Sequence, residues 1–245
     1  MDRDLYLAEH LEELRRRLII TTGFFLIFFI VFFVYVENIY EFLIKDLEDK
    51  LAILGPADIL WVYFLISGVF AIAFTIPIAA YQIWKFVLPA LDPNERKSTL
   101  LLIPSLFILF LTGIGFGYMI VFPTVLSFMQ NMSTGHFETF YTTEKYFRFM
   151  INLTFPFGVL FELPAVILFL TSLGILNPAR LAKTRKIAYF ILIVTAVLIT
   201  PPDFISDFLV MVPLLLLYEV SITLSRVVYR KKLRKENFLH SNLKS

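Results

Sequence analysis

Glu162 is the acidic residue in the middle of the apolar stretch FPFGVLFELPAV, residues 155–166. A carboxylate this deep in a segment typical of a lipid-buried helix is unfavourable by up to about 3 kcal/mol, so such residues usually face a cavity or a partner. Three roles are open for it. It is a protonated acid bonded to a neighbouring helix, a contact for a polar ligand in a cavity, or a proton-coupling site.

A second group of charges lies in YLAEHLEELRRRLI, residues 6–19. Its leucines recur every three or four residues, a pattern typical of an amphipathic helix. The acids beside this stripe can pair with Arg16 and Arg17 at a spacing of four residues, a contribution of a few tenths of a kcal/mol per pair. Two interpretations stay open: a helix on the membrane surface, or a carboxylate held there to bind a cationic ligand.

Three further acids lie close to prolines. In WKFVLPALDPNERKS, residues 84–98, Asp92, Pro93 and Glu95 fit the N-cap, first and third positions of a helix. Glu95 can present an oxygen to a ligand even in that role. Asp203, in TPPD, fits the N-cap of the last apolar run.

Patterns for catalysis are missing from the sequence. We find no HExxH, Walker loop, GxSxG or glycine-rich dinucleotide turn. The chain has no Cys, and its three His lie outside the apolar runs, at His10, His136 and His240. We therefore predict that the protein is not an enzyme and holds no cofactor or metal.

The composition indicates a membrane protein, with 58% hydrophobic and 17% charged residues against about half and a quarter in soluble domains. A membrane-spanning helix needs roughly 20 apolar residues. No signal-peptide cleavage site precedes the first run, which we expect to remain as an anchor. The sequence predicts an all-α polytopic protein with six transmembrane helices: Leu18–Val36, Ile59–Leu88, Ser98–Met129, Phe147–Leu173, Ile187–Thr200 and Phe204–Val228.

The positive charges predict the orientation of these helices, because Lys and Arg favour cytoplasmic loops. Of the 22 Lys and Arg, the loops on one side hold only Lys45, Lys50, Lys145 and Arg148. Both termini are therefore expected in the cytoplasm. The fifth and sixth helices are short, and prolines bend helices two, three, four and six. We expect kinked helices in a cupped body.

We predict a single transmembrane domain over residues 1–245. It comprises a cytoplasmic amphipathic segment, 1–17, a six-helix membrane body, 18–228, and a basic cytoplasmic tail, 229–245. The tail contains RKKLRKE. Directly after a membrane span, such a cluster is typical of an anchor beside anionic lipid rather than a site for nucleic acid.

Four motifs together resemble the TatC family, the signal-peptide receptor subunit of the twin-arginine protein translocase. They are HLEELRRRL, YQIWKFVLPALDPNERK, FGVLFELP and TPPD, in this order along the chain. The resemblance covers roughly residues 7–229. One position departs from the pattern of many relatives, since Lys97 stands where a second Arg is common.

The resemblance implies a role in protein export across the bacterial inner membrane. TatC-like proteins bind signal peptides with two adjacent arginines and move folded cargo with single-span TatA-like and TatB-like partners. The proton-motive force drives the process, and the receptor works as an oligomer in a complex surrounded by lipid. The matching signal-peptide-binding residues are Glu13, Arg15, Arg17, Phe86, Pro89, Glu95 and Arg96. The matching intramembrane acid is Glu162, and the matching acid of the outer loop is Asp203.

Two adjacent guanidinium groups present two forks, and carboxylates match such forks with paired hydrogen bonds. Glu13 and Glu95 could each bind one of them. Lysine would bind less well, because it is a point charge without the fork. The alternative function is a proton-coupled small-solute transporter that uses Glu162, although the internal repeats common in transporters are absent from the sequence.

Overall fold

A computed structural model describes residues 2–45, 51–88, 96, 100, 102–133, 141–200 and 204–242. Side chains are described within these ranges, except at 2–10, 132–133, 204–205, 231–232 and 234–242. The elements of these residues are all helices, one of them a π-helix, η2. They are α1 (Asp2–Val34), α2 (Val36–Ile44), α3 (Pro56–Val87), α5 (Leu102–Phe116), η2 (Gly117–Val121), α6 (Phe122–Ser133), α7 (Thr143–Phe161), α8 (Leu163–Ser172), α9 (Pro178–Lys183), α10 (Arg185–Ile199) and α11 (Phe204–Asn242).

Five stretches of helix in the described residues are long and apolar enough to cross a membrane. They are Leu11–Val34, Pro56–Val87, Leu102–Asn131, Thr143–Ser172 and Ser206–Arg230. They overlap the first four predicted spans and the sixth, which confirms an all-α protein with several membrane spans. Helix α10 overlaps the fifth predicted span and has 15 residues. It is not one of the five, and its crossing of the membrane stays a prediction.

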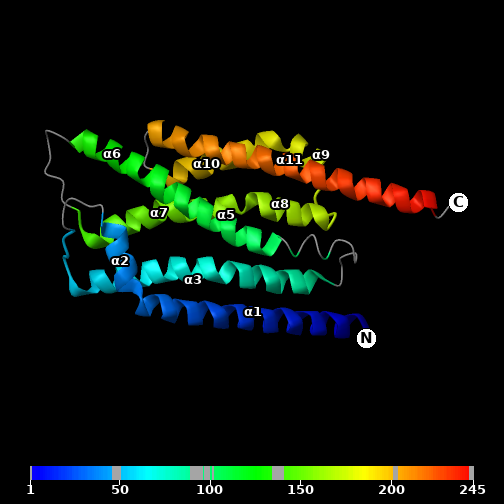
Figure 1. Ribbon diagram of the computed structural model, residues 1–245, viewed down its shortest axis with the longest axis horizontal. Helices are drawn as coiled ribbons and strands as arrows, with labels where there is room; N and C mark the ends of the chain where they lie inside the picture. Colours follow the sequence, from blue (N-terminus) through cyan, green and yellow to red (C-terminus); the bar gives the residue numbers. More distant parts are fainter. Residues whose placement is uncertain are drawn as a thin grey trace.

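Most helices run side by side along the long axis of the molecule, and α2 crosses their direction (Figure 1). Helix α3 packs against α1 on one side and against α5 and α7 on the other, while α11 packs against α8 and α10. The start of α1 and the end of α11 lie at the same end of the bundle (Figure 1), which we call the terminal end. The opposite end is called the distal end.

Two helices are longer than the predicted segments. Helix α1 runs without a break from Asp2 to Val34, so residues 1–17 do not form the separate membrane-surface helix that we considered. Helix α11 continues to Asn242, and the predicted start of the tail at residue 229 therefore falls inside a helix.

The helix break at Glu162 follows from Pro164. Proline has no backbone N–H to donate to the preceding turn, and its ring disfavours a regular helix there. Glu162 is the C-cap of α7 and the N-cap of α8, and the backbone N–H of Val166 donates to its carbonyl at 3.0 Å. The break between the two helices therefore falls at the residue that carries the carboxylate.

Close contact between α5 and α7 depends on glycine. A Cβ atom on Gly113 would lie 2.4 Å from the carbonyl oxygen of Phe157, and one on Gly117 would lie 2.8 Å from the Cα of Thr154. Small residues let the backbones of membrane helices approach in this way. Around this crossing the largest fully buried side chains include Phe110, Phe147, Leu153 and Phe157.

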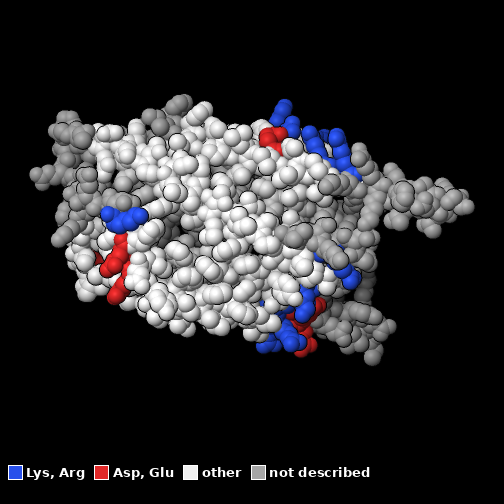
Figure 2. Space-filling model, viewed as in Figure 1, with Lys and Arg blue, Asp and Glu red and all other residues white. Residues whose placement is uncertain are grey.

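The surface of the molecule divides into an apolar middle and charged ends. Figure 2 shows a broad uncharged zone between two groups of charged side chains, with most of the Lys and Arg at the terminal end. Helix α1 faces outward along its length, since none of the residues in its most apolar stretch is buried. This distribution fits a helix bundle surrounded by lipid.

Two loops meet at the distal end. The N–H of Ala52 donates to the carbonyl of Tyr141 at 3.1 Å, and the N–H of Thr143 donates to the carbonyl of Ala52 at 2.8 Å. The hydroxyl of Thr143 donates to the same carbonyl at 3.1 Å. These bonds join the chain just before α3 to the start of α7.

Candidate functional site

Glu13 lies on α1, at a point where this helix adjoins α3. Arg17, one helical turn along, donates from Nη2 to Oε1 of Glu13 and from Nη1 to the backbone carbonyl of Gln82 at 3.3 Å. The side chain of Arg17 is 12% exposed, whereas that of Glu13 is 41% exposed. The predicted pairing at four-residue spacing is thereby confirmed for this pair, and it leaves the acid more accessible than the base.

A groove beside this pair runs between α1 and α3. Its volume is about 190 Å³, and Arg17 is its charged lining residue. The other lining residues are Leu14, Leu18, Thr21, Ala79, Gln82, Ile83 and Phe86. A ligand in this groove could place a cation at Glu13 and an apolar group against Phe86.

Glu162 lines a larger hollow of about 400 Å³ between α3, α5 and α8. Apart from Glu162 the lining is almost entirely apolar, and it includes Trp84 and Phe169. Both carboxylate oxygens are buried and have no hydrogen-bond partner among the described residues. The interpretation of Glu162 as an acid bonded to a neighbouring helix is therefore not supported in this structure, whereas a role toward a ligand in a cavity keeps its support.

The two hollows meet at α3. Ala79 and Ile83 line both of them, so the groove at Arg17 and the hollow at Glu162 adjoin the same stretch of one helix. Glu13 and Glu162 thus belong to neighbouring depressions, although they are far apart in the sequence.

The other predicted site residues divide into those described and those outside the described residues. Phe86 lines the groove, while Arg15 and Arg96 are exposed. Pro89, Glu95 and Asp203 lie outside the described residues. The structure therefore brings Glu13, Arg17 and Phe86 together.

Gln82 and Trp84 are among the lining residues that the sequence analysis did not single out. Gln82 supplies a backbone carbonyl to Arg17, and Trp84 faces the hollow of Glu162. Both belong to the motif YQIWKF. Because they lie two positions apart on one helix, they face different sides of α3, and this spacing could have suggested two different neighbours. The residue type, however, does not reveal which backbone carbonyl accepts a hydrogen bond.

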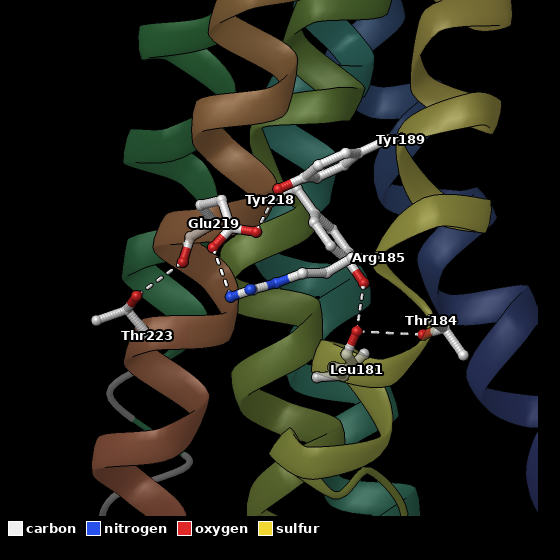
Figure 3. A network of polar contacts seen from close by, with 7 residues as sticks. All are labelled: Leu181, Thr184, Arg185, Tyr189, Tyr218, Glu219 and Thr223. Carbon is white, nitrogen blue, oxygen red and sulfur yellow. Dashed lines mark hydrogen bonds and ion pairs between the residues drawn. The ribbon is translucent and has the colours of Figure 1, made fainter.

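A separate polar network lies near the terminal end, between α9, α10 and α11 (Figure 3). Arg185 donates to Oε2 of Glu219 at 2.8 Å, and the Tyr189 hydroxyl donates to Oε1 at 2.5 Å. The Tyr218 hydroxyl donates to the Leu181 carbonyl at 3.0 Å. Both partners of the Glu219 carboxylate come from α10. This network ties helices together and faces neither hollow.

The chemistry available at these sites is recognition rather than bond making. Among the described residues no group of three or more His, Asp or Glu could hold a metal ion. The carboxylates lie beside apolar hollows, an arrangement suited to binding a cationic or polar group that belongs to an otherwise apolar ligand.

Known proteins share this sequence and architecture. Residues 9–213 match the family model described as Sec-independent protein translocase protein (TatC). The protein TatCd of Bacillus subtilis (strain 168) is 62% identical over 234 residues, which are 96% of this chain and 97% of that protein. TatCy of the same organism is 44% identical over 92% of this chain and 90% of its own length.

Solved structures agree with the sequence relatives. A crystal structure of the twin-arginine translocase receptor TatC in DDM superposes with a TM-score of 0.77 at 34% identity, covering 88% of this chain and 99% of that one. A second crystal structure of this receptor gives a TM-score of 0.75 at 33% identity. The chain belongs to the TatC family of Sec-independent protein translocase proteins.

Proposed function

We propose that the protein is the core receptor subunit of a twin-arginine translocase and binds twin-arginine signal peptides of folded cargo proteins. The observation that carries this proposal is the accessible Glu13 carboxylate at the edge of an apolar groove. Family membership supports the same function. The relatives are named translocase proteins, which favours a receptor over a small-solute transporter that uses Glu162.

The two arginines of the peptide would bind two separate acids. Glu13 receives one guanidinium, and Glu95, in the segment after α3, receives the other. Arg15, Arg96 and Pro89 complete the surface around them. The apolar part of the peptide would lie in the groove against Phe86, where burial contributes about 25 cal/mol per Å².

Glu162 would then serve as a polar contact inside the membrane, for the peptide or for a polar residue of a partner helix. Its two buried oxygens, which no described residue hydrogen-bonds, support this role. TatA-like and TatB-like single-span proteins are the proposed partners, within an oligomeric complex in lipid. The proton-motive force drives export, and Asp203 belongs to the loop on the far side of the membrane.

The proposed topology is six spans in the bacterial inner membrane with both termini in the cytoplasm. The shared position of the chain ends and the Lys and Arg at the terminal end support it (Figures 1 and 2). Helix α10 would be the fifth span. Its 15 residues give about 22 Å against a hydrocarbon core of about 30 Å, so the bilayer would be thin beside it.

Peptide binding to the purified protein tests the receptor function. A fluorescent twin-arginine signal peptide should bind the detergent-solubilised protein at least about tenfold more tightly than its twin-lysine version, because only the guanidinium fork matches the carboxylate. Glu13→Gln should remove most of this preference. In cells, Glu13→Lys and Glu95→Lys should block export while the protein still inserts.

Glu12→Gln is the matched control, since Glu12 precedes Glu13 on the same helix and is exposed. It should leave the preference for arginine intact. Photo-crosslinkers at Phe86 and Glu95 should capture the peptide only when its arginine pair is present. Equal binding of the twin-arginine and twin-lysine peptides by the unmodified protein would refute the receptor function.

A further inference from the structure

Arg17 is a cation placed directly against the acid that must bind a cation. A positive charge beside a binding carboxylate opposes the arrival of another positive charge, so its presence there requires a reason. The pair Glu144–Arg148 has the same four-residue spacing, but its arginine is 52% exposed and its ion pair spans 2.7 Å near the distal end. Arg17 is instead 12% exposed and tied to a second helix.

The contacts of Arg17 fix its guanidinium. One amino group bonds the Gln82 carbonyl of α3, and the other bonds the Glu13 carboxylate. Because the arginine is held from α3, its hydrogen bond to Oε1 in turn limits the orientations of the carboxylate, and so of its plane. A carboxylate accepts about four hydrogen bonds, so Arg17 and an arriving cation can bond to it together.

We propose that Arg17 is the positioning residue that makes Glu13 selective for arginine over lysine. The inference rests on the proposed function. Arg17 acts in two ways on an arriving cation. Its charge opposes every cation equally, and its hold on the carboxylate plane favours only a cation with directional requirements.

The two effects add up differently for the two side chains. The guanidinium binds through a planar fork, so a carboxylate plane fixed in advance spares it the entropy of orienting that group. The lysine ammonium is a compact point charge that approaches a carboxylate from many directions and gains nothing from a fixed plane. The repulsion from Arg17 therefore weakens the binding of lysine without compensation. For arginine, the favourable orientation of the carboxylate offsets that repulsion. Specificity of this kind arises from a repulsive element as much as from an attractive one.

Two substitutions separate the two effects. Arg17→Gln removes both the charge and the fixed plane, so the affinity for the twin-arginine peptide should change less than about threefold while the affinity for the twin-lysine peptide rises about fivefold. Arg17→Lys keeps the charge and loses the planar hold, so the twin-arginine affinity should fall about fivefold with the twin-lysine affinity unchanged. Both variants lower the preference for arginine, by opposite routes.

Arg16→Gln is the matched control, because Arg16 is the exposed neighbour of Arg17 and loses the same charge. It should change both affinities together and preserve their ratio. A purely structural role of Arg17 would likewise lower both affinities together, and an unchanged ratio in Arg17→Gln and Arg17→Lys would overturn the inference. If the unmodified protein fails to discriminate between the peptides, the receptor function itself fails.

A measurement on the unmodified protein keeps the inference testable if the variants do not fold. A peptide whose arginines carry symmetric dimethylation keeps its charge but loses the paired hydrogen bonds. It should bind no more tightly than the twin-lysine peptide. Binding as tight as that of the unmethylated twin-arginine peptide would show that charge alone suffices and would overturn the inference.

Discussion

Glu162 and Glu219 are both glutamates inside predicted membrane spans, yet their surroundings are opposite. Both oxygens of Glu219 are hydrogen-bonded, one to Arg185 and one to Tyr189 (Figure 3). Both oxygens of Glu162 are buried beside an apolar hollow and have no partner in the part of the chain that the structure describes. Glu219 is paired within the fold, and Glu162 is paired by none of the described residues.

The presence or absence of a hydrogen-bond partner distinguishes these two acids more clearly than their depth in a span does. A buried polar group without a hydrogen bond lowers stability by about 1–3 kcal/mol. Such a group therefore marks a place where the fold bears a penalty that a ligand or partner can relieve. An acid that is paired between two helices does not bear this stability penalty.

The largest effect on stability is expected where α5 crosses α7 most closely. Gly113→Ala places a Cβ within 2.4 Å of the Phe157 carbonyl oxygen, so α5 must move away from α7. Overpacking of this kind costs about 3 kcal/mol, which lowers the thermal unfolding midpoint by roughly 5–10 °C. Scanning fluorimetry of the purified protein measures it.

Gly115→Ala is the control on the same helix, because nothing lies within 4 Å of its added Cβ. It should leave the midpoint almost unchanged. Equal midpoints for the two variants would show that the close crossing of α5 and α7 does not contribute to stability.

A smaller loss of stability is expected at the paired acid. Glu219→Gln breaks the ion pair with Arg185, whose two side chains are 37% and 35% exposed and therefore screened by solvent. We expect about 1 kcal/mol and a midpoint lower by about 2–4 °C, with the binding of the signal peptide unchanged. Arg185→Gln should have a similar effect.

The double variant sharpens this result. Two groups that interact with each other show non-additive losses, so Glu219→Gln combined with Arg185→Gln should lower the midpoint by less than the sum of the two single changes. Fully additive losses would mean that the pair does not tie α10 to α11.

The smallest change in stability is expected at Glu162. Glu162→Gln keeps the shape of the side chain and breaks no ion pair with a described residue, so the midpoint should shift by less than about 1 °C or rise. Export of a twin-arginine cargo should nevertheless fall, because the amide no longer offers a carboxylate to a partner. A loss of stability as large as that of Glu219→Gln would remove the contrast between the two acids.

The sequence predicts the membrane architecture well, because apolar length is a local property. Five of the six predicted runs reappear as long apolar helices. Pro164 also marks the helix break, since its missing N–H acts within one turn. Other elements were missed because they depend on distant contacts, such as the π-helix at Gly117, which packs against Thr154.

The candidate site was predictable in part. The pairing of Glu13 with Arg17 follows from helical spacing alone, and the structure confirms it. The burial of Arg17 depends on the carbonyl of Gln82, 65 residues away, and the partner of Glu219 lies 34 residues away. No periodicity within one helix carries such information.

The backbone bonds of Ala52 with Tyr141 and Thr143 have a mechanical consequence. They clamp the beginnings of α3 and α7 to each other at one extremity of the bundle. Any splaying of these two helices must therefore pivot about that clamp and grow with distance from it. The greatest widening would fall toward the opposite extremity, where the depressions beside Arg17 and Glu162 lie.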